Sequence, residues 1–338
     1  MPKHRVTRRR LLAAAAPVVA ATPFAKLALA AGDHAEHAGM SMAAIDHAAM
    51  GHAAMIGSDA LAPGGPNERD ALLYPPAALG HRPGRVREYA VAAVDRQIEV
   101  AKGVFFSAWT YNGTVPGPVI RATEGDLLRV RFTNGGSHPH TIHFHGIHPA
   151  TMDGVPGLGA GQIEPGGSTV YEFDALPAGL HLYHCHVRPL AEHIAKGLYG
   201  AFIIDPAEPR EDADELVMVM NGFDTNFDRA NEVYAANTIG FAYMDRPIQA
   251  RLNELVRVYV VNVLEYDLIN SFHLHGNLFD YFPTGTSRTA SELTDTVMLC
   301  QGQRGILQWR FAHPGKYMFH AHQSEFTELG WQGFFEVA

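Results

Sequence analysis

The chain has 338 residues, which is long enough for two domains of ordinary size. Its formal net charge at pH 7 is -9, and Lys and Arg cluster only at the extreme N-terminus, which argues against a nucleic acid as the partner. Only two cysteines occur, Cys185 and Cys300, so the chain is not a small scaffold held by several disulfides. Stability must come from a large apolar core, in which Cys300 is expected to be a buried strand residue.

Residues 1–30 have the pattern of an export signal. The stretch 7–12 contains three consecutive arginines and opens an apolar run rich in alanine, and residues 28–30 (Ala-Leu-Ala) are the small residues that a signal peptidase prefers. The apolar run is too short to span a bilayer. The sequence therefore predicts a twin-arginine signal peptide, a mature chain that begins near Ala31, and a periplasmic or extracellular location.

Residues 31–84 form a segment that we expect to be flexible and to lead into the folded part. It has no periodic apolar pattern, and His and Met are scattered in it among Ala and Gly, at His34, His37, Met40, Met42, His47, Met50, His52 and Met55. Imidazole and thioether groups suit Cu(II) and Cu(I). The segment is therefore either a copper-collecting tail or a low-complexity linker, and both interpretations stay open.

From about residue 85 the pattern is that of an all-β protein. Short apolar runs rich in Val, Ile, Phe and Tyr are broken by Gly, Pro, Asn and Asp, as in β-sandwiches. The stretch 206–214, rich in Pro and charge, separates two halves with the same order of motifs, so duplication predicts domains at 85–205 and 215–338. The predicted strands are 87–94, 118–122, 126–133, 140–146, 168–174, 180–186, 198–204, 216–221, 256–263, 270–276, 295–300, 305–311, 316–321 and 333–337.

A pattern of two histidines separated by one residue occurs four times, twice in each half. Side chains of a β-strand alternate between its faces, so both histidines of a pair point the same way and can bind one metal cluster. A single pair is weak evidence, but two matched pairs in each half indicate a multicopper site. The pairs are His143 and His145, His184 and His186, His273 and His275, and His320 and His322.

A second metal centre is predicted on the other side of the same strands. Cys185 lies between the two histidines of its pair and therefore faces into its own domain. His140 is an odd number of positions before His143, so in a regular strand it faces the same side as Cys185, and His193 follows after a loop. Two imidazoles and a thiolate form the trigonal set of a blue, type 1 copper site that transfers electrons.

Several stretches resemble two-domain multicopper oxidases, which are laccase-like relatives of the copper nitrite reductases. Residues 111–118 (Tyr-Asn-Gly-Thr-Val-Pro-Gly-Pro), followed by Gly-Asp at 125–126, are similar to the opening signature of these oxidases. Phe-His-Gly at 144–146 is similar to their first copper motif, and residues 325–330 look like the end of a copper nitrite reductase. The resemblance covers nearly everything after about residue 85 and implies two Greek-key cupredoxin domains.

The resemblance also implies where the coppers lie. Leu198 takes the axial, non-ligating place at the type 1 copper, where many relatives have methionine. Domain 2 has Asn270 and Ala321 where a type 1 site would need histidine and cysteine, so it should hold none. Its four pattern histidines and the four of domain 1 would supply eight ligands to a trinuclear type 2 and type 3 cluster, giving about four coppers per chain.

These coppers imply an oxidoreductase that couples one-electron oxidation of phenols, aromatic amines or cuprous ion to four-electron reduction of O2 to water. Protons must also reach the cluster. Asp153 lies where laccases carry an acidic residue, and Glu325 or Glu328 could serve the dioxygen side. For Asp153 the alternative is a turn residue before glycine. The sequence does not give the physiological electron donor.

The sequence also bears on how copies of the chain assemble, and it leaves two other functions open. Each domain holds half of the cluster ligands, so the cluster lies between domains of one chain or of neighbours; the relatives use neighbours, which implies a cyclic homotrimer. A copper nitrite reductase is one alternative, although in that family an aspartate stands where this chain has His143. A non-catalytic copper-binding or copper-tolerance protein is another, and it would not need Cys185 between two histidines.

Overall fold

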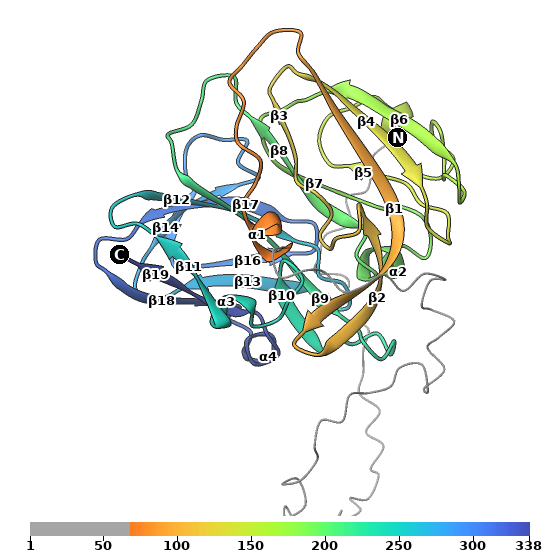
Figure 1. Ribbon diagram of the computed structural model, residues 1–338. Coiled ribbons are helices and arrows are strands. Elements are labelled where there is room, and N and C mark those ends of the chain that lie inside the picture. The colour runs from red at the N-terminus through yellow and green to blue at the C-terminus, as the bar shows by residue number, and fades with distance from the viewer. Residues whose placement is uncertain (1–67) are drawn as a thin grey trace, which may run out of the picture. The chain divides into compact units, whose positions relative to one another are not determined.

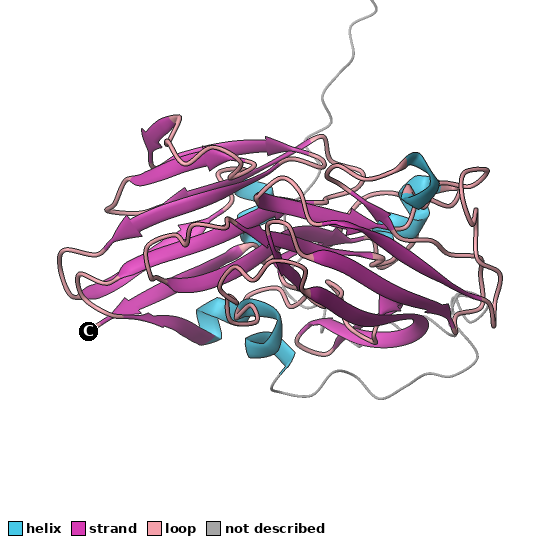
Figure 2. Ribbon diagram, turned by 90° about the horizontal axis from the view of Figure 1, so that it is seen from above, coloured by secondary structure: helices cyan, strands magenta, loops and turns pink. Residues whose placement is uncertain are grey.

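The computed structural model describes residues 68–338. The predicted signal peptide and most of the predicted His/Met-rich segment lie outside these residues. Within them the chain is mostly strands, with a 3-10 turn at Ala150–Met152 and short helices α1 (Glu68–Leu73), α2 (Leu190–Ala195), α3 (Ala242–Asp245) and α4 (Ser324–Glu328) (Figure 2). The predicted all-β fold is confirmed.

The first half forms two four-stranded sheets around one apolar core (Figure 1). Its strands are β1 (Val86–Ala101), β2 (Val104–Tyr111), β3 (Ile120–Thr123), β4 (Leu127–Asn134), β5 (His143–Phe144), β6 (Ser168–Asp174), β7 (Gly179–His184) and β8 (Tyr199–Asp205). Their orders are β2-β1-β4-β6 and β3-β8-β7-β5. Alternation along β4 places Leu128, Val130 and Phe132 in the core, as a strand with one buried face requires.

The second half forms a six-stranded and a five-stranded sheet, with orders β10-β9-β12-β17-β14-β15 and β11-β19-β18-β13-β16. Its strands are β9 (Asp214–Phe223), β10 (Val233–Ala236), β11 (Arg246–Ala250), β12 (Leu255–Asn262), β13 (Ile269–Leu274), β14 (Phe279–Pro283), β15 (Glu292–Thr294), β16 (Thr296–Cys300), β17 (Arg304–Arg310), β18 (Gly315–His320) and β19 (Gln332–Val337). Phe272, Phe319 and Trp331 lie in its apolar core.

The two halves repeat one topology. In the first half β1 is parallel to β4 and β3 is parallel to β8; in the second half β9 is parallel to β12 and β11 is parallel to β19. The antiparallel pair β5 and β7, which carries two histidine motifs, corresponds to the pair β13 and β18. The repeat follows from the duplicated order of motifs in the sequence, and residues 206–213 between the halves form no strand or helix.

A third apolar core joins the two halves. It combines Leu182 and Ile203 of the first half with Val219 and Val261 of the second. Ion pairs also join the two halves: the buried Arg121 on β3 binds Asp205 of the first half at 2.7 Å and Glu215 on β9 of the second half at 2.7 Å. The second half therefore packs directly against the β7 side of the first half, where the sequence predicts copper ligands.

Several local predictions were wrong. The strand expected at 140–146 is reduced to β5, because the backbone around His140 makes only an isolated bridge to Ile163. Strands β2, β10, β11, β14 and β15 were not predicted; four of them have only three to five residues, too few to show a periodic pattern. Cys300 is exposed rather than buried, because Val297 and Leu299 of β16 point inward and the alternation turns Met298 and Cys300 outward. Both cysteines are free thiols.

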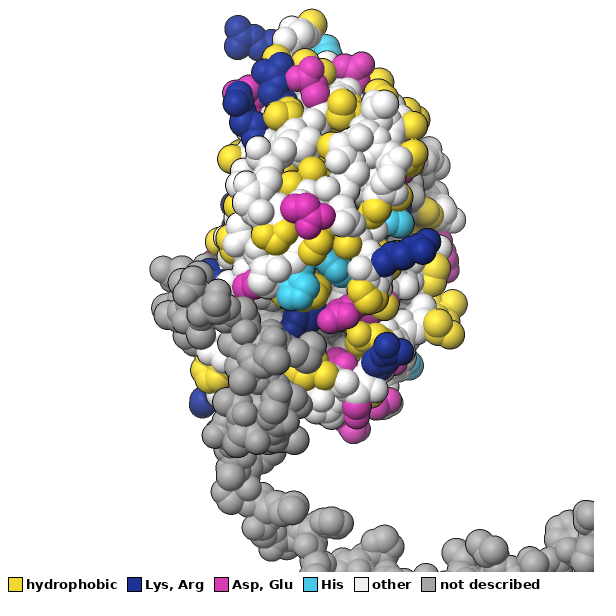
Figure 3. Space-filling view, turned by 90° about the vertical axis from the view of Figure 1, so that its right-hand side faces the viewer, with side chains coloured by type: hydrophobic (Ala, Val, Ile, Leu, Met, Phe, Trp, Pro, Cys, Tyr) yellow, Lys and Arg dark blue, Asp and Glu magenta, His cyan; other side chains and the backbone are white. Residues whose placement is uncertain are grey.

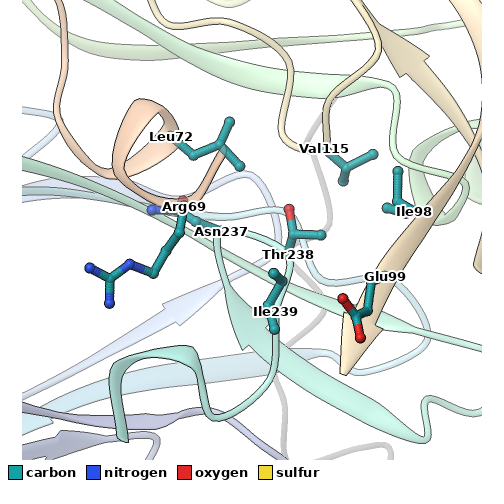
Figure 4. Close-up of a pocket in the computed structure, with 8 residues that line it drawn as sticks. All are labelled: Arg69, Leu72, Ile98, Glu99, Val115, Asn237, Thr238 and Ile239. Carbon is teal, nitrogen blue, oxygen red and sulfur yellow. The ribbon is translucent and has the colours of Figure 1, made fainter. Parts of the chain in front are cut away.

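Two further features of the described residues bear on function. A small pocket beside α1, with a volume of about 10 Å³, has room for about one water molecule and not for a substrate. Figure 4 shows the residues that line it: Arg69, Leu72, Ile98, Glu99, Val115, Asn237, Thr238 and Ile239. No helix within residues 68–338 is long and apolar enough to cross a membrane.

Candidate metal centres

Three side chains that the sequence places far apart meet in the core of the first half. His140 precedes β5, Cys185 directly follows β7, and His193 lies on α2. Cys185 Sγ is 3.3 Å from His193 Nδ1 and 3.9 Å from His140 Nδ1, and the two Nδ1 atoms are 3.3 Å apart. All three residues are buried. The structure thus brings the predicted type 1 ligands together, although the strand expected to include His140 begins only at His143.

The donor set and its spacing fit a trigonal metal ion. Metal–nitrogen bonds of about 2 Å at trigonal angles would place the donor atoms about 3.5 Å apart, close to the observed separations. Burial lowers the pKa of His140 to about 3 and that of His193 to about 4, so both imidazoles are neutral and offer lone pairs. Burial raises the pKa of the Cys185 thiol, and a bound cation would favour the thiolate.

The loop that closes this set is fixed by backbone hydrogen bonds. The Cys185 N–H donates to the Leu198 carbonyl at 2.9 Å, and the Leu198 N–H donates to the His193 carbonyl at 3.3 Å. The Thr141 N–H lies 3.4 Å from Cys185 Sγ. Leu198 is fully buried in the same apolar core as Cys185. Its side chain therefore adds apolar surface to this core and offers no donor atom.

A histidine cluster lies on the other side of the same strands. His143 and His184 are paired in register between β5 and β7, and His145 Nε2 lies 3.1 Å from His184 Nε2. His143 Nδ1 donates to the Asp153 carbonyl at 2.7 Å, and His184 Nδ1 donates to the Cys185 carbonyl at 2.8 Å. Because a carbonyl only accepts, these bonds leave each Nε2 with its lone pair.

The second half contains a matching cluster. His273 and His320 are paired in register between β13 and β18, and His275 Nε2 lies 2.9 Å from His320 Nε2. His273 Nδ1 donates to the Asp295 carbonyl at 2.9 Å, and His320 Nδ1 donates to the Ala321 carbonyl. The fourth histidine of each cluster packs against the first: the ring centroids are 5.3 Å apart for His143 and His186 and for His273 and His322. Each half therefore presents the same preorganised set of imidazoles.

The two clusters differ in their surroundings. The first lines a cavity of about 330 Å³, whose opposite wall comes from the second half through Val263, Glu265 and Gln301. In the second cluster His275 and His322 are exposed. No ring contact or hydrogen bond within residues 68–338 joins the two clusters, so each stands as a half-site.

The predicted proton donors fall in two places. Asp153 Oδ1 lies 3.2 Å from His143 Nδ1 and 3.7 Å from His148 Nε2, so this carboxylate is adjacent to the first cluster. Glu325 and Glu328 are exposed on α4. The contact that α4 makes with the second cluster comes from Thr327, whose Oγ1 lies 3.3 Å from His320 Nδ1.

The structure adds an acidic residue that sequence reasoning missed. Glu265, in the loop after β12, lines the cavity of the first cluster together with Gln301. Burial raises the pKa of Glu265 to about 7, whereas a hydrogen bond with Gln301 lowers it. It belongs to the second half and faces histidines of the first, so only the packing of the two halves reveals it.

Comparisons with known proteins agree with this geometry. Two family models, each described as multicopper oxidase, match residues 93–209 and 211–338. The chain belongs to the multicopper oxidase family. Its membership makes it an oxidoreductase that uses copper, and the copper-fitting donor sets described above lie within the matched residues.

Among solved structures, one described as a multicopper oxidase is 58% identical with a TM-score of 0.76 and covers 79% of this chain and 96% of its own. The copper-containing nitrite reductase of Neisseria meningitidis serogroup A is 31% identical over 268 residues, which are 73% of this chain and 68% of that protein. Laccase-2 of Botryotinia fuckeliana is 40% identical over 136 residues, 39% of this chain but 23% of that protein.

In this multicopper oxidase the second half offers no thiolate site equivalent to that of Cys185. Asn270 is buried, and its Oδ1 accepts from the Ser271 N–H at 2.8 Å. Ala321 is buried at the place that corresponds to Cys185, and Phe326 and Trp331 pack in the same apolar core. Hydrocarbon and aromatic side chains therefore occupy this region in place of metal donors.

Proposed function

We propose that this multicopper oxidase couples the one-electron oxidation of a phenolic or aromatic donor, or of cuprous ion, to the four-electron reduction of O2 to water. The observation that carries the proposal is the position of Cys185. It is buried 3.3 Å from His193 Nδ1, while its neighbours in sequence, His184 and His186, belong to the histidine cluster. The site of one-electron transfer at Cys185 is thereby separate from the histidine cluster proposed for four-electron O2 reduction, and residues 184–186 connect the two.

In the proposed arrangement His140, Cys185 and His193 would hold a type 1 copper, with the apolar Leu198 in the same core. The four histidines of a first-domain cluster and the four of a second-domain cluster would together hold one trinuclear type 2 and type 3 centre, which brings the content to about four coppers per chain. When bound, these coppers supply electron transfer and O2 reduction. The protein supplies a through-bond path, to which the hydrogen bond from His184 Nδ1 to the Cys185 carbonyl adds a second contact.

We further propose that the trinuclear centre forms between neighbouring copies in a cyclic homotrimer. The half-site of the second domain is exposed at His275 and His322. Two exposed apolar side chains belong to the same sheet: Leu268, just before β13, is 86% exposed, and Met298 on β16 is 67% exposed. A surface that combines unsatisfied metal ligands with apolar side chains fits a second copy of the chain, and head-to-tail contacts close into a ring. A monomer with full activity in solution would overturn this assembly.

Asp153 and Glu265 are the proton donors that we propose for the first half-site. Asp153 orients His143 through its carbonyl and reaches the same Nδ1 through Oδ1. Glu265 lines the cavity opposite the histidines, beside Gln301. Glu325 and Glu328 lie on α4, near the second half-site, and their role in proton supply stays a prediction for the assembled protein. Replacing each acid by its amide and comparing the rates of O2 reduction separates these roles.

Export and domain limits remain proposals from the sequence. We propose a twin-arginine signal at 1–30, a His/Met-rich segment at 31–84, cupredoxin domains at 85–205 and 215–338, and a periplasmic or extracellular location. N-terminal sequencing of the exported protein tests the signal. Copper occupancy at limiting copper, measured with and without residues 32–60, tests the copper-collecting role; unchanged occupancy would refute it.

A nitrite reductase is the second candidate, because a protein of that name is 31% identical to this chain over 268 residues. Oxygen uptake with a phenolic donor and with Cu(I), measured beside copper per chain and nitrite consumption, separates the two functions. The oxidase predicts O2 consumption, a blue band and about four coppers per chain. A protein with about two coppers that is inert toward O2 and active on nitrite would establish the reductase.

A further inference from the structure

A cleft beside α2 lies between the two halves of the chain. Its volume is about 500 Å³, which is within the range of sites for small organic molecules. Phe106 of β2 and Lys196, which follows α2, come from the first half; Asp224, Phe227 and Tyr266 come from the second half. The same helix carries His193, so the cleft adjoins the proposed type 1 centre without belonging to it.

The unusual group in this cleft is the ammonium of Lys196. The residue is 3% exposed, and Nζ has no hydrogen-bond partner within the described residues. Nζ lies 4.9 to 5.7 Å from the ring centroids of Phe227, Phe106 and Trp109. Aromatic faces attract a cation, but they leave its N–H donors without an oxygen acceptor, and a buried donor without one is costly. An oxyanion in the cleft would supply that acceptor.

Trp109 connects the cleft to the copper ligands. Its ring centroid is 4.8 Å from that of His193 and 5.4 Å from that of His140, and the same ring lies under the Lys196 ammonium. His140 and His193 do not line the cleft, so a donor molecule bound there does not contact either imidazole. The Trp109 ring therefore lies against both the Lys196 ammonium and the His193 imidazole, and it is the group that links the cleft to the copper ligands.

We propose that this cleft binds the electron donor as an aromatic oxyanion, with its oxygen on Lys196 Nζ and its ring against Phe106 and Phe227. The inference rests on the proposed oxidase function and names its donor class. When His140, Cys185 and His193 hold copper, that metal would supply a one-electron acceptor, with the Trp109 ring between it and the Lys196 side chain; a bound phenolate that gives up one electron would become a neutral phenoxyl radical. No bond breaks and no proton moves in this step. The lost charge weakens the attraction to Lys196, which favours release of the product.

The same surroundings disfavour cuprous ion as the occupant of this cleft. Its lining side chains include no His, Met or Cys, which are the ligands that Cu(I) prefers. The Lys196 ammonium also repels a cation. Glu192 and Asp224 line the cleft together with two cationic side chains, Lys196 and Arg229. Because the charges of the lining balance, the cleft does not favour anions with several charges, and one negative charge on an aromatic ring fits best.

Calorimetric titration of the copper-loaded protein tests the proposal, with benzoate as an anionic probe that is not oxidised and benzyl alcohol as its neutral analogue. We expect Lys196→Met to weaken benzoate binding at least about tenfold and to leave benzyl alcohol binding unchanged. Lys196→Arg keeps the charge and should bind benzoate within a few-fold of the original protein. Lys316→Met is the matched control, because Lys316 Nζ also lies over a ring, that of Phe334 at 4.2 Å, but outside the cleft.

Equal benzoate affinity in Lys196→Met, or no benzoate binding by the unsubstituted protein, would overturn the inference. Phe227→Leu, which keeps Lys196, provides a second variant should Lys196→Met fail to fold, and it should weaken both probes. Oxygen uptake with hexaammineruthenium(II), a cation that needs no oxyanion site, keeps the two proposals apart. If O2 is consumed with this reductant but benzoate does not bind, only the proposed donor site is refuted. If no donor supports O2 consumption, the proposed oxidase function is refuted.

Discussion

Replacing Glu265 by Gln should make the copper-free protein more stable at alkaline pH while slowing O2 reduction in the loaded enzyme. Burial raises the pKa of Glu265 from 4.5 to about 7. Between these values the folded state holds a proton that the unfolded state has lost, so stability falls as the pH rises from 4.5 and stays lower above about 7. The amide carries no charge and avoids this loss.

The size of the effect follows from the shift. The difference of about 2.5 between the two pKa values corresponds to at most about 3.4 kcal/mol. Glu265 keeps partial contact with solvent, and screening reduces the effect to about 1–2 kcal/mol. We therefore expect Glu265→Gln to be about 1–2 kcal/mol more stable than the original protein at pH 8 and nearly equal to it at pH 4.5.

Urea unfolding of the copper-free proteins at several pH values measures this difference. Glu254→Gln is the matched control, because Glu254 is exposed just before β12, and it should show no pH-dependent gain. In the loaded enzyme, Glu265→Gln should slow the reaction of the reduced protein with O2 by about tenfold or more, as removal of a general acid does. A variant with unchanged stability at pH 8 and an unchanged rate and pH profile would refute the reasoning.

Three further predictions concern other residues. Leu198→Met should lower the reduction potential of the type 1 copper, because a thioether donor favours Cu(II); redox titration of the blue band checks this, and no change or a rise would remove Leu198 from the axial place. Arg121→Met should destabilise the protein by about 3–5 kcal/mol in urea unfolding, since it leaves the largely buried carboxylate of Asp205 without its ion-pair partner, while Glu215 keeps Arg257; a loss below about 1 kcal/mol would contradict this. Benzoate binding should weaken as the pH rises past about 8, because burial lowers the pKa of Lys196 to about 8 against the opposing charges of Glu192, Asp95 and Asp224; calorimetry from pH 6 to 10 that shows constant affinity would oppose the ammonium's role.

The sequence predicted the site best where the position of a side chain depends only on its neighbours in the same strand. Alternation along a strand predicted that the two histidines of each pair face one cluster, and the structure places the pairs around His143 and His273 in that way. The residues around Cys185 also meet as expected, but the stated reason was wrong for His140, which lies in an isolated bridge rather than a strand. The loop geometry that brings it to Cys185 depends on contacts with Ile163, which no local pattern contains.

Features that depend on the packing of the two halves were beyond sequence reasoning. Glu265 and Lys196 carry no motif, and each becomes notable only because the other half of the chain encloses it. Cys300 was misplaced for a related reason: periodicity shows that β16 has two faces, but not which face an edge strand turns to solvent. The short strands β10 and β11 were missed because their pairing with β9 and β19 is set by tertiary contacts.

The central claim is that four one-electron oxidations are joined to the reduction of one O2 to water. The most direct test is the stoichiometry of donor oxidised per O2 consumed, measured with an oxygen electrode and a donor whose oxidised form is followed optically. We predict a ratio of four without release of hydrogen peroxide. A ratio of two with hydrogen peroxide, or donor oxidation that requires nitrite and leaves O2 untouched, would contradict the proposed function.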